Sequence, residues 1–103
     1  MARDVEKLRK DERAVLGWPA IVNEIPQMLL DLSVGGAQVR FLHPDDAPRL
    51  PFEVRFSLFP QMPALVLQAQ LVWKRGRRVG FRWVGLSKRN HKTLAALIRF
   101  HRA

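Results

Sequence analysis

The chain has 103 residues, of which 48% are hydrophobic and 26% are charged, as expected for one folded domain rather than a disordered chain. It contains no cysteine, which excludes a disulfide framework, a thiolate metal site and a cysteine nucleophile. No apolar run approaches the ~20 residues that span a bilayer, and the charged residues 1–10 lack the apolar stretch of a signal peptide. We therefore expect a cytoplasmic protein without membrane insertion.

The formal net charge of +9 is distributed unevenly along the sequence. Residues 1–53 carry seven basic and nine acidic side chains, whereas residues 54–103 carry eleven basic and no acidic ones. Such asymmetry indicates an anionic partner, which could be nucleic acid, a nucleotide phosphate, a membrane surface or an acidic protein. A solvated basic face that maintains solubility is the alternative.

The spacing of proline, glycine and apolar residues predicts short β-strands behind a polar N-terminal segment. Residues 1–13 are expected to form a flexible arm, and residues 14–103 a single domain. Alternation of apolar and polar residues, the pattern of half-buried strands, is clearest in the central segments. Strands are expected at 18–22, 28–32, 37–42, 52–59, 65–73 and 79–86. Pro26, between the first two strands, indicates a turn or an edge position.

The last residues follow a helical pattern. Three apolar residues spaced for one face of an amphipathic helix are Leu94, Leu97 and Ile98. Either Ser87 or Asn90 could be the N-cap. The two basic residues that follow Ser87 would oppose the helix dipole, which keeps Asn90 open as an alternative. Six short strands and a terminal helix predict an antiparallel barrel or a strongly curled sheet.

Trp73 has two interpretations. Strict alternation places it on the same face as Leu67 and Leu71, which predicts a core position. It also ends its strand beside the basic segment 74–78, a predicted hairpin tip, where the indole could stack on a nucleobase.

Catalytic motifs are not evident in the sequence. It contains no glycine-rich phosphate loop with a Walker lysine and no paired-histidine zinc motif. His43, His91 and His101 are too far apart in sequence to suggest one metal site. We therefore expect neither enzymatic activity nor a bound metal.

Two short motifs stand out by their order and separation. The first, Arg9-Lys10-Asp11-Glu12-Arg13, has the form R-x-x-x-R and precedes the first predicted strand. The second, Asp31-Leu32-Ser33-Val34-Gly35-Gly36, has the form D-x-S-x-x-G and lies at the end of the second predicted strand. Each motif alone is weak evidence for a function, but the two motifs in this order and at this separation are a far more specific signal.

With these motifs, residues 9–100 resemble a PilZ domain, the bacterial receptor module for cyclic di-GMP. The resemblance extends to the segments Leu71-Val72-Trp73, Val79-Gly80-Phe81-Arg82-Trp83 and Gly85-Leu86-Ser87. It implies a mostly β fold, a six-stranded antiparallel β-barrel with one C-terminal α-helix. Trp83 stands where the family usually has Phe, and the usual Pro and acids after Ser87 are missing. Neither departure falls on the ligand motifs.

Cyclic di-GMP carries two phosphates and two guanines, which suit these residue types. The guanidinium of arginine matches phosphate oxygens or guanine O6 and N7 in a bidentate geometry. An ionised aspartate accepts the N1–H and N2–H donors of guanine, and glycine allows a turn that a side chain would block. The resemblance assigns the ligand to Arg9, Arg13, Asp31, Ser33 and Gly36, with Lys10 and Trp73 as further candidates. A β-turn capped by Asp31 and Ser33, beside a solvated arginine arm, is the structural alternative.

The resemblance implies a non-catalytic receptor that needs no cofactor and relays cyclic di-GMP binding to an unidentified effector protein. With 103 residues, no attached output domain is expected. The alternative is a small basic barrel that binds nucleic acid, which steep salt dependence would reveal. Leu8, where related chains that bind paired ligands have a basic residue, implies one ligand per chain, although Lys7, Lys10 and the hairpin tip could neutralise a second.

We predict that the arm is mobile without cyclic di-GMP and ordered with it, because it has few apolar residues to anchor it and carries both motif arginines. Backbone NMR relaxation of residues 5–14, recorded with and without cyclic di-GMP, tests this. Rigid order in the ligand-free protein would contradict an arm that closes on the ligand.

Overall fold

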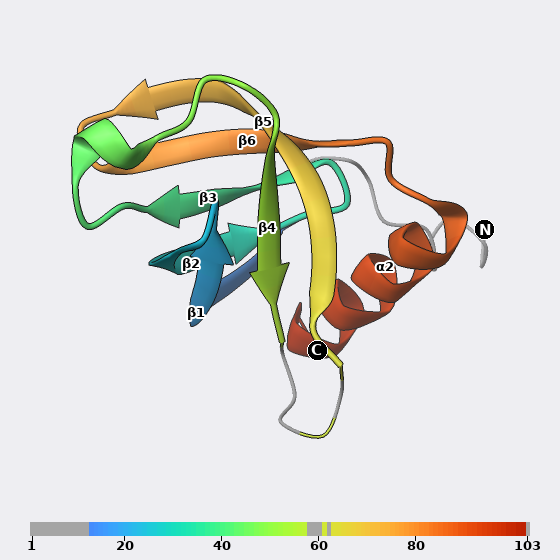
Figure 1. Cartoon of the computed structure of the whole chain (residues 1–103). Helices are drawn as coiled ribbons and strands as arrows, with labels where there is room; N and C mark the ends of the chain where they lie inside the picture. Colours follow the sequence, from blue (N-terminus) through green and yellow to red (C-terminus); the bar gives the residue numbers. More distant parts are fainter. Residues whose placement is uncertain (1–12, 58–60, 62, 103) are drawn as a thin grey trace.

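The structure is a computed structural model that describes residues 13–57, 61 and 63–102 (Figure 1). The predicted arm up to residue 12, with Leu8, Arg9 and Lys10, lies outside the described residues. The strands are β1 (Ala14–Val22), β2 (Ile25–Leu32), β3 (Gly36–Arg40), β4 (Phe52–Phe56), β5 (Leu65–Arg75) and β6 (Arg78–Val84). A 3-10 turn, η1 (Pro44–Asp46), precedes β4, and a helix, α2 (Lys88–Arg102), follows β6.

The strands form a closed antiparallel barrel in the order β1-β2-β3-β6-β5-β4, which confirms the predicted fold. Strand β3 pairs with β6 from Gly36 opposite Arg82 to Arg40 opposite Arg78. The barrel closes where β1 pairs with β4, at Ile21 opposite Arg55 and Val22 opposite Val54. Closure pairs each strand on both sides and so removes the exposed edges that invite aggregation.

Alternating inward side chains of the strands and one face of α2 form the core. The predicted helix stripe of Leu94, Leu97 and Ile98 is buried in the same apolar cluster as the barrel residues. Ser87 is the N-cap: Asn90 N–H donates to its Oγ at 3.1 Å and His91 N–H to its carbonyl oxygen at 2.8 Å. The side-chain cap therefore outweighs the unfavourable basic residues in the first turn.

The β1–β2 hairpin differs from the sequence prediction. Strand β1 begins at Ala14, which is buried, four residues before the predicted start. The prediction of a turn or an edge at Pro26 is wrong, because Pro26 lies within β2 and is paired with Ile21. The turn is made by Asn23 and Glu24, both with positive φ, of 50° and 69°. Two consecutive residues with positive φ match the right-handed twist of the paired strands in a tight hairpin. Because Glu rarely adopts this conformation, the Asn23–Glu24 pair is not a recognisable turn motif.

Gly36 begins β3 rather than occupying a left-handed turn, and its missing side chain serves strand packing. A Cβ atom at this position would overlap the carbonyl oxygen of Phe81 and come within 2.9 Å of the Cα atom of Arg82. The close approach of β3 to β6 therefore requires glycine here. That a side chain would also obstruct a ligand stays a prediction.

We predict that Gly36→Ala lowers the free energy of unfolding by about 1–3 kcal/mol, because the backbone of β6 must move to accept the methyl group. Urea denaturation followed by circular dichroism measures the loss. Gly17→Ala is the matched control, since a Cβ atom there has no heavy atom within 4 Å. Equal stability of the two variants would show that β3 and β6 are not in this close contact.

Candidate ligand-binding site

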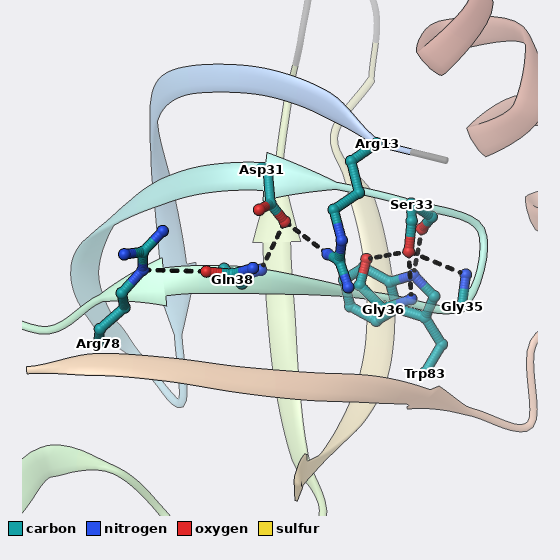
Figure 2. Close-up of polar contacts among 8 residues, drawn as sticks. All are labelled: Arg13, Asp31, Ser33, Gly35, Gly36, Gln38, Arg78 and Trp83. Atoms are coloured by element: carbon teal, nitrogen blue, oxygen red, sulfur yellow. Dashed lines mark hydrogen bonds and ion pairs between the residues drawn. The ribbon is translucent and has the colours of Figure 1, made fainter. Parts of the chain in front are cut away.

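The D-x-S-x-x-G motif forms a loop whose shape depends on Ser33 (Figure 2). The buried Ser33 Oγ accepts hydrogen bonds from the N–H groups of Gly35 at 3.2 Å and Gly36 at 3.1 Å. It donates to the carbonyl oxygen of Gly36 at 3.2 Å. The Trp83 indole Nε1–H donates to the Ser33 carbonyl at 3.0 Å, which ties the loop to β6. Ser33 therefore holds the loop through its own hydroxyl group, a role that the turn alternative anticipated.

Asp31 lies on β2, is only 8% exposed and is held by two donors from other parts of the chain. Its Oδ1 accepts from Arg13 Nη1 at 2.7 Å and from the Gln38 backbone N–H at 3.2 Å (Figure 2). Among the described residues, no donor bonds Oδ2. The structure thus brings the last arginine of the first motif onto the carboxylate of the second, and the described residues leave Oδ2 of that carboxylate without a donor.

Strand pairing aligns Asp31 with three further positions on the outer surface of the barrel. Asp31 pairs with Gln38, Gln38 with Gly80, and Gly80 with Trp73. Directly paired residues project to the same face of a sheet. These four positions therefore form one outward row across β2, β3, β6 and β5. Arg78 Nε donates to Gln38 Oε1 at 3.0 Å beside this row.

A register shift in β5 decides the orientation of Trp73. Leu71 pairs with Phe81, whereas Trp73 pairs with Gly80, so one extra residue of β5 lies between the two pairs. Because Phe81 and Gly80 are consecutive in β6 and point to opposite faces, Leu71 and Trp73 do too. The core position that strict alternation predicted for Trp73 is wrong. Its half-buried indole lies over Gly80, where a Cβ atom would overlap it.

A surface hollow of about 280 Å³ joins these features. Four predicted site residues line it: Arg13, Ser33, Gly36 and Trp73. Asp31 adjoins it through its bonds to Arg13 and Gln38. Arg9 and Lys10, the remaining predicted residues, are not described, and so their placement at the site stays a prediction.

Two polar residues that no sequence motif indicated also line the hollow, Gln38 and Arg82. Arg82 Nη2 donates to Gln70 Oε1 at 2.9 Å, which holds the guanidinium against the surface of β5. Both residues occupy polar positions in strands that alternate apolar and polar residues, and this pattern alone indicated that they face outward. Gln38 lies opposite Asp31 through the pairing of β2 with β3, and Arg82 lies opposite Gly36 through the pairing of β3 with β6. The sequence shows neither pairing.

The hollow combines cationic, acceptor and aromatic groups on a rigid sheet. Arg13 and Arg82 provide positive charge and Trp73 an aromatic face, and the adjoining Asp31 is an anionic acceptor. Within the described part of the chain, no group of three histidine or acidic residues could hold a metal ion. The arrangement suits a ligand that is anionic, aromatic and rich in N–H donors. The fold and this hollow define a small β-barrel domain with a candidate binding site on its outer surface.

Comparisons with known proteins agree with this class. A model of the PilZ domain family matches residues 8–100, so the chain belongs to the PilZ domain family. No curated protein matches the sequence.

Two solved structures share the fold. The chain is similar to the PilZ domain of CeSA from a cellulose-synthesizing bacterium, with 21% identity and a TM-score of 0.69, covering 88% of this chain and 98% of that one. It is also similar to the PilZ domain of YcgR from Escherichia coli, solved with c-di-GMP, with 17% identity and a TM-score of 0.72, covering 93% and 92%. Of the described helices, none has the length and apolar character that crossing a membrane requires.

Proposed function

We propose that this protein is a non-catalytic receptor that binds cyclic di-GMP in the hollow beside Asp31 and relays binding to a partner protein. The observation that carries the proposal is the placement of Arg13, Asp31 and Trp73 around one hollow of a PilZ barrel. The c-di-GMP named for the YcgR domain supports the choice of ligand.

Each group in the hollow matches part of this ligand. Asp31 offers Oδ2 to the N1–H and N2–H donors of one guanine, a pairing that a neutral side chain makes less well. Trp73 presents an indole face for stacking on a base, which contributes about 1–3 kcal/mol per base. Arg82, fixed by Gln70, adds positive charge for a phosphate.

The ion pair between Arg13 and Asp31 shapes how the ligand would enter. A buried carboxylate needs a partner, and in the ligand-free protein Arg13 provides it. Arginine carries five N–H donors, so one bond to Oδ1 leaves others for a phosphate or for guanine O6 and N7. Arg13 therefore preorganises Asp31 and remains able to contact the ligand, while Arg9 would close over it from the arm.

We predict that Arg13→Ala and Asp31→Asn each weaken cyclic di-GMP binding by roughly ten- to a hundredfold, because each removes a charge-assisted hydrogen bond worth about 1.5–3 kcal/mol. Asparagine can retain an acceptor for the Gln38 N–H, so the fold should survive. Isothermal titration calorimetry measures affinity, with GTP as a ligand control, and thermal melting reports the fold. We expect the same loss of affinity for Arg9→Ala, at a residue outside the described part of the chain.

Arg99→Ala is the control matched to Arg13→Ala, because Arg99 is exposed on α2 and its substitution also removes one positive charge. Its affinity should equal that of the wild type. If Arg13→Ala and Asp31→Asn also bind like the wild type, with unchanged melting temperatures, the ligand does not bind in this hollow.

We further predict that Gly80→Ala weakens cyclic di-GMP binding by roughly five- to a hundredfold, because its methyl group displaces the Trp73 indole from the stacking position. Trp73→Ala should cause a similar loss. In a double-mutant cycle, Gly80→Ala should have no further effect once Trp73 is alanine. Additive losses would show that Gly80 acts through something other than Trp73.

A further inference from the structure

A second hollow, of about 350 Å³, lies where β2 begins and β3 ends, and it shares no residue with the hollow beside Asp31. Pro26 and Met28 of β2 line it, together with Phe41 and Leu42, which follow β3. Leu42 is 65% exposed and Met28 is 42% exposed. Exposed large apolar side chains beside a hollow are typical of surfaces that bind other proteins. Methionine adds adaptability at such surfaces.

Gln27, one of the residues that line this hollow, carries a buried donor without an acceptor. Gln27 is 7% exposed, and its Oε1 accepts the Leu42 backbone N–H at 2.7 Å. That bond fixes the amide orientation, so Nε2 is the donor, and it has no hydrogen-bond partner among the described residues. Because a buried donor without an acceptor is unfavourable, an occupant with carbonyl groups would gain more here than a purely apolar one.

The charge around the second hollow is positive. Arg40 and Arg77 line it, and its lining includes no acidic residue. Arg40 pairs directly with Arg78, which pairs in turn with Arg75, so three cations lie in one outward row across β3, β6 and β5. Like charges directly opposite one another in a sheet are destabilising. An anionic group placed against this row would relieve that repulsion.

We propose that the second hollow docks a segment of a partner protein in which an apolar side chain is flanked by aspartate or glutamate. The apolar side chain would bury against Met28 and Leu42, the acid would pair with Arg40 and Arg77, and a backbone carbonyl would accept from Gln27 Nε2. Nucleic acid would use the arginines but would leave the apolar lining without a partner. This inference rests on the proposed adaptor function, since it names the chemistry of the partner.

Selection of random displayed 12-residue peptides on the full chain tests the proposal. The selected peptides should share an apolar residue within three positions of Asp or Glu. Leu42→Asp should weaken their binding roughly tenfold or more, whereas Leu50→Asp, at an exposed leucine outside the hollow, should not. The double variant Arg40→Glu with Arg77→Glu should select basic peptides instead, and Arg99→Glu is its control. Thermal melting confirms that each variant folds.

Three outcomes would overturn the docking site. These are the absence of an enriched peptide family, equal binding by Leu42→Asp and the wild type, and displacement of the peptides by single-stranded RNA through the arginine row. Cyclic di-GMP is titrated into the same protein samples in parallel. Intact cyclic di-GMP binding without peptide binding rejects the docking site alone, and the reverse result rejects the receptor function alone.

Discussion

The pairing of β3 with β6 is the constraint on which the hollow beside Asp31 depends. It joins residues about forty positions apart in sequence, and it brings the loop of the D-x-S-x-x-G motif against the strand that follows the basic hairpin. Gly36 permits this close approach because it has no Cβ atom, which would otherwise overlap the backbone carbonyl oxygen of Phe81. Trp83 then bonds the Ser33 carbonyl from the same strand. The β3–β6 pairing therefore positions both the Ser33 loop and the β6 side of the hollow.

Much of the barrel could be predicted from the sequence, because each half-buried strand repeats its burial every second residue. The alternation of Phe52, Val54 and Phe56 indicated a strand, and all three are buried. The helix was predictable for the same reason, since its buried residues follow the period of one helical face. Local patterns of this kind depend on neighbours in sequence, which the chain itself displays.

The failures came from effects that no local pattern contains. The extra residue before Trp73 changes which face the indole occupies, and alternation assumes that no such irregularity exists. The partner of Asp31 on β3, Gln38, depends on the register between strands, which a single sequence leaves open. The Asn23–Glu24 turn uses positive φ at a residue type that seldom adopts it. Candidate residues carried by motifs could be named from the sequence, whereas those that strand pairing adds to the hollow could not.

The short pairing between β1 and β4 determines where the barrel opens locally. Two residue pairs join these strands in the described part of the chain, both at the end of β1 far from Arg13. Amide hydrogen exchange follows local opening, and opening begins where few backbone bonds must break. The barrel should therefore part first between β1 and β4, while β2, β3, β6 and β5 stay joined. The surface around Asp31 would keep its shape through fluctuations that transiently turn the closed barrel into an open sheet.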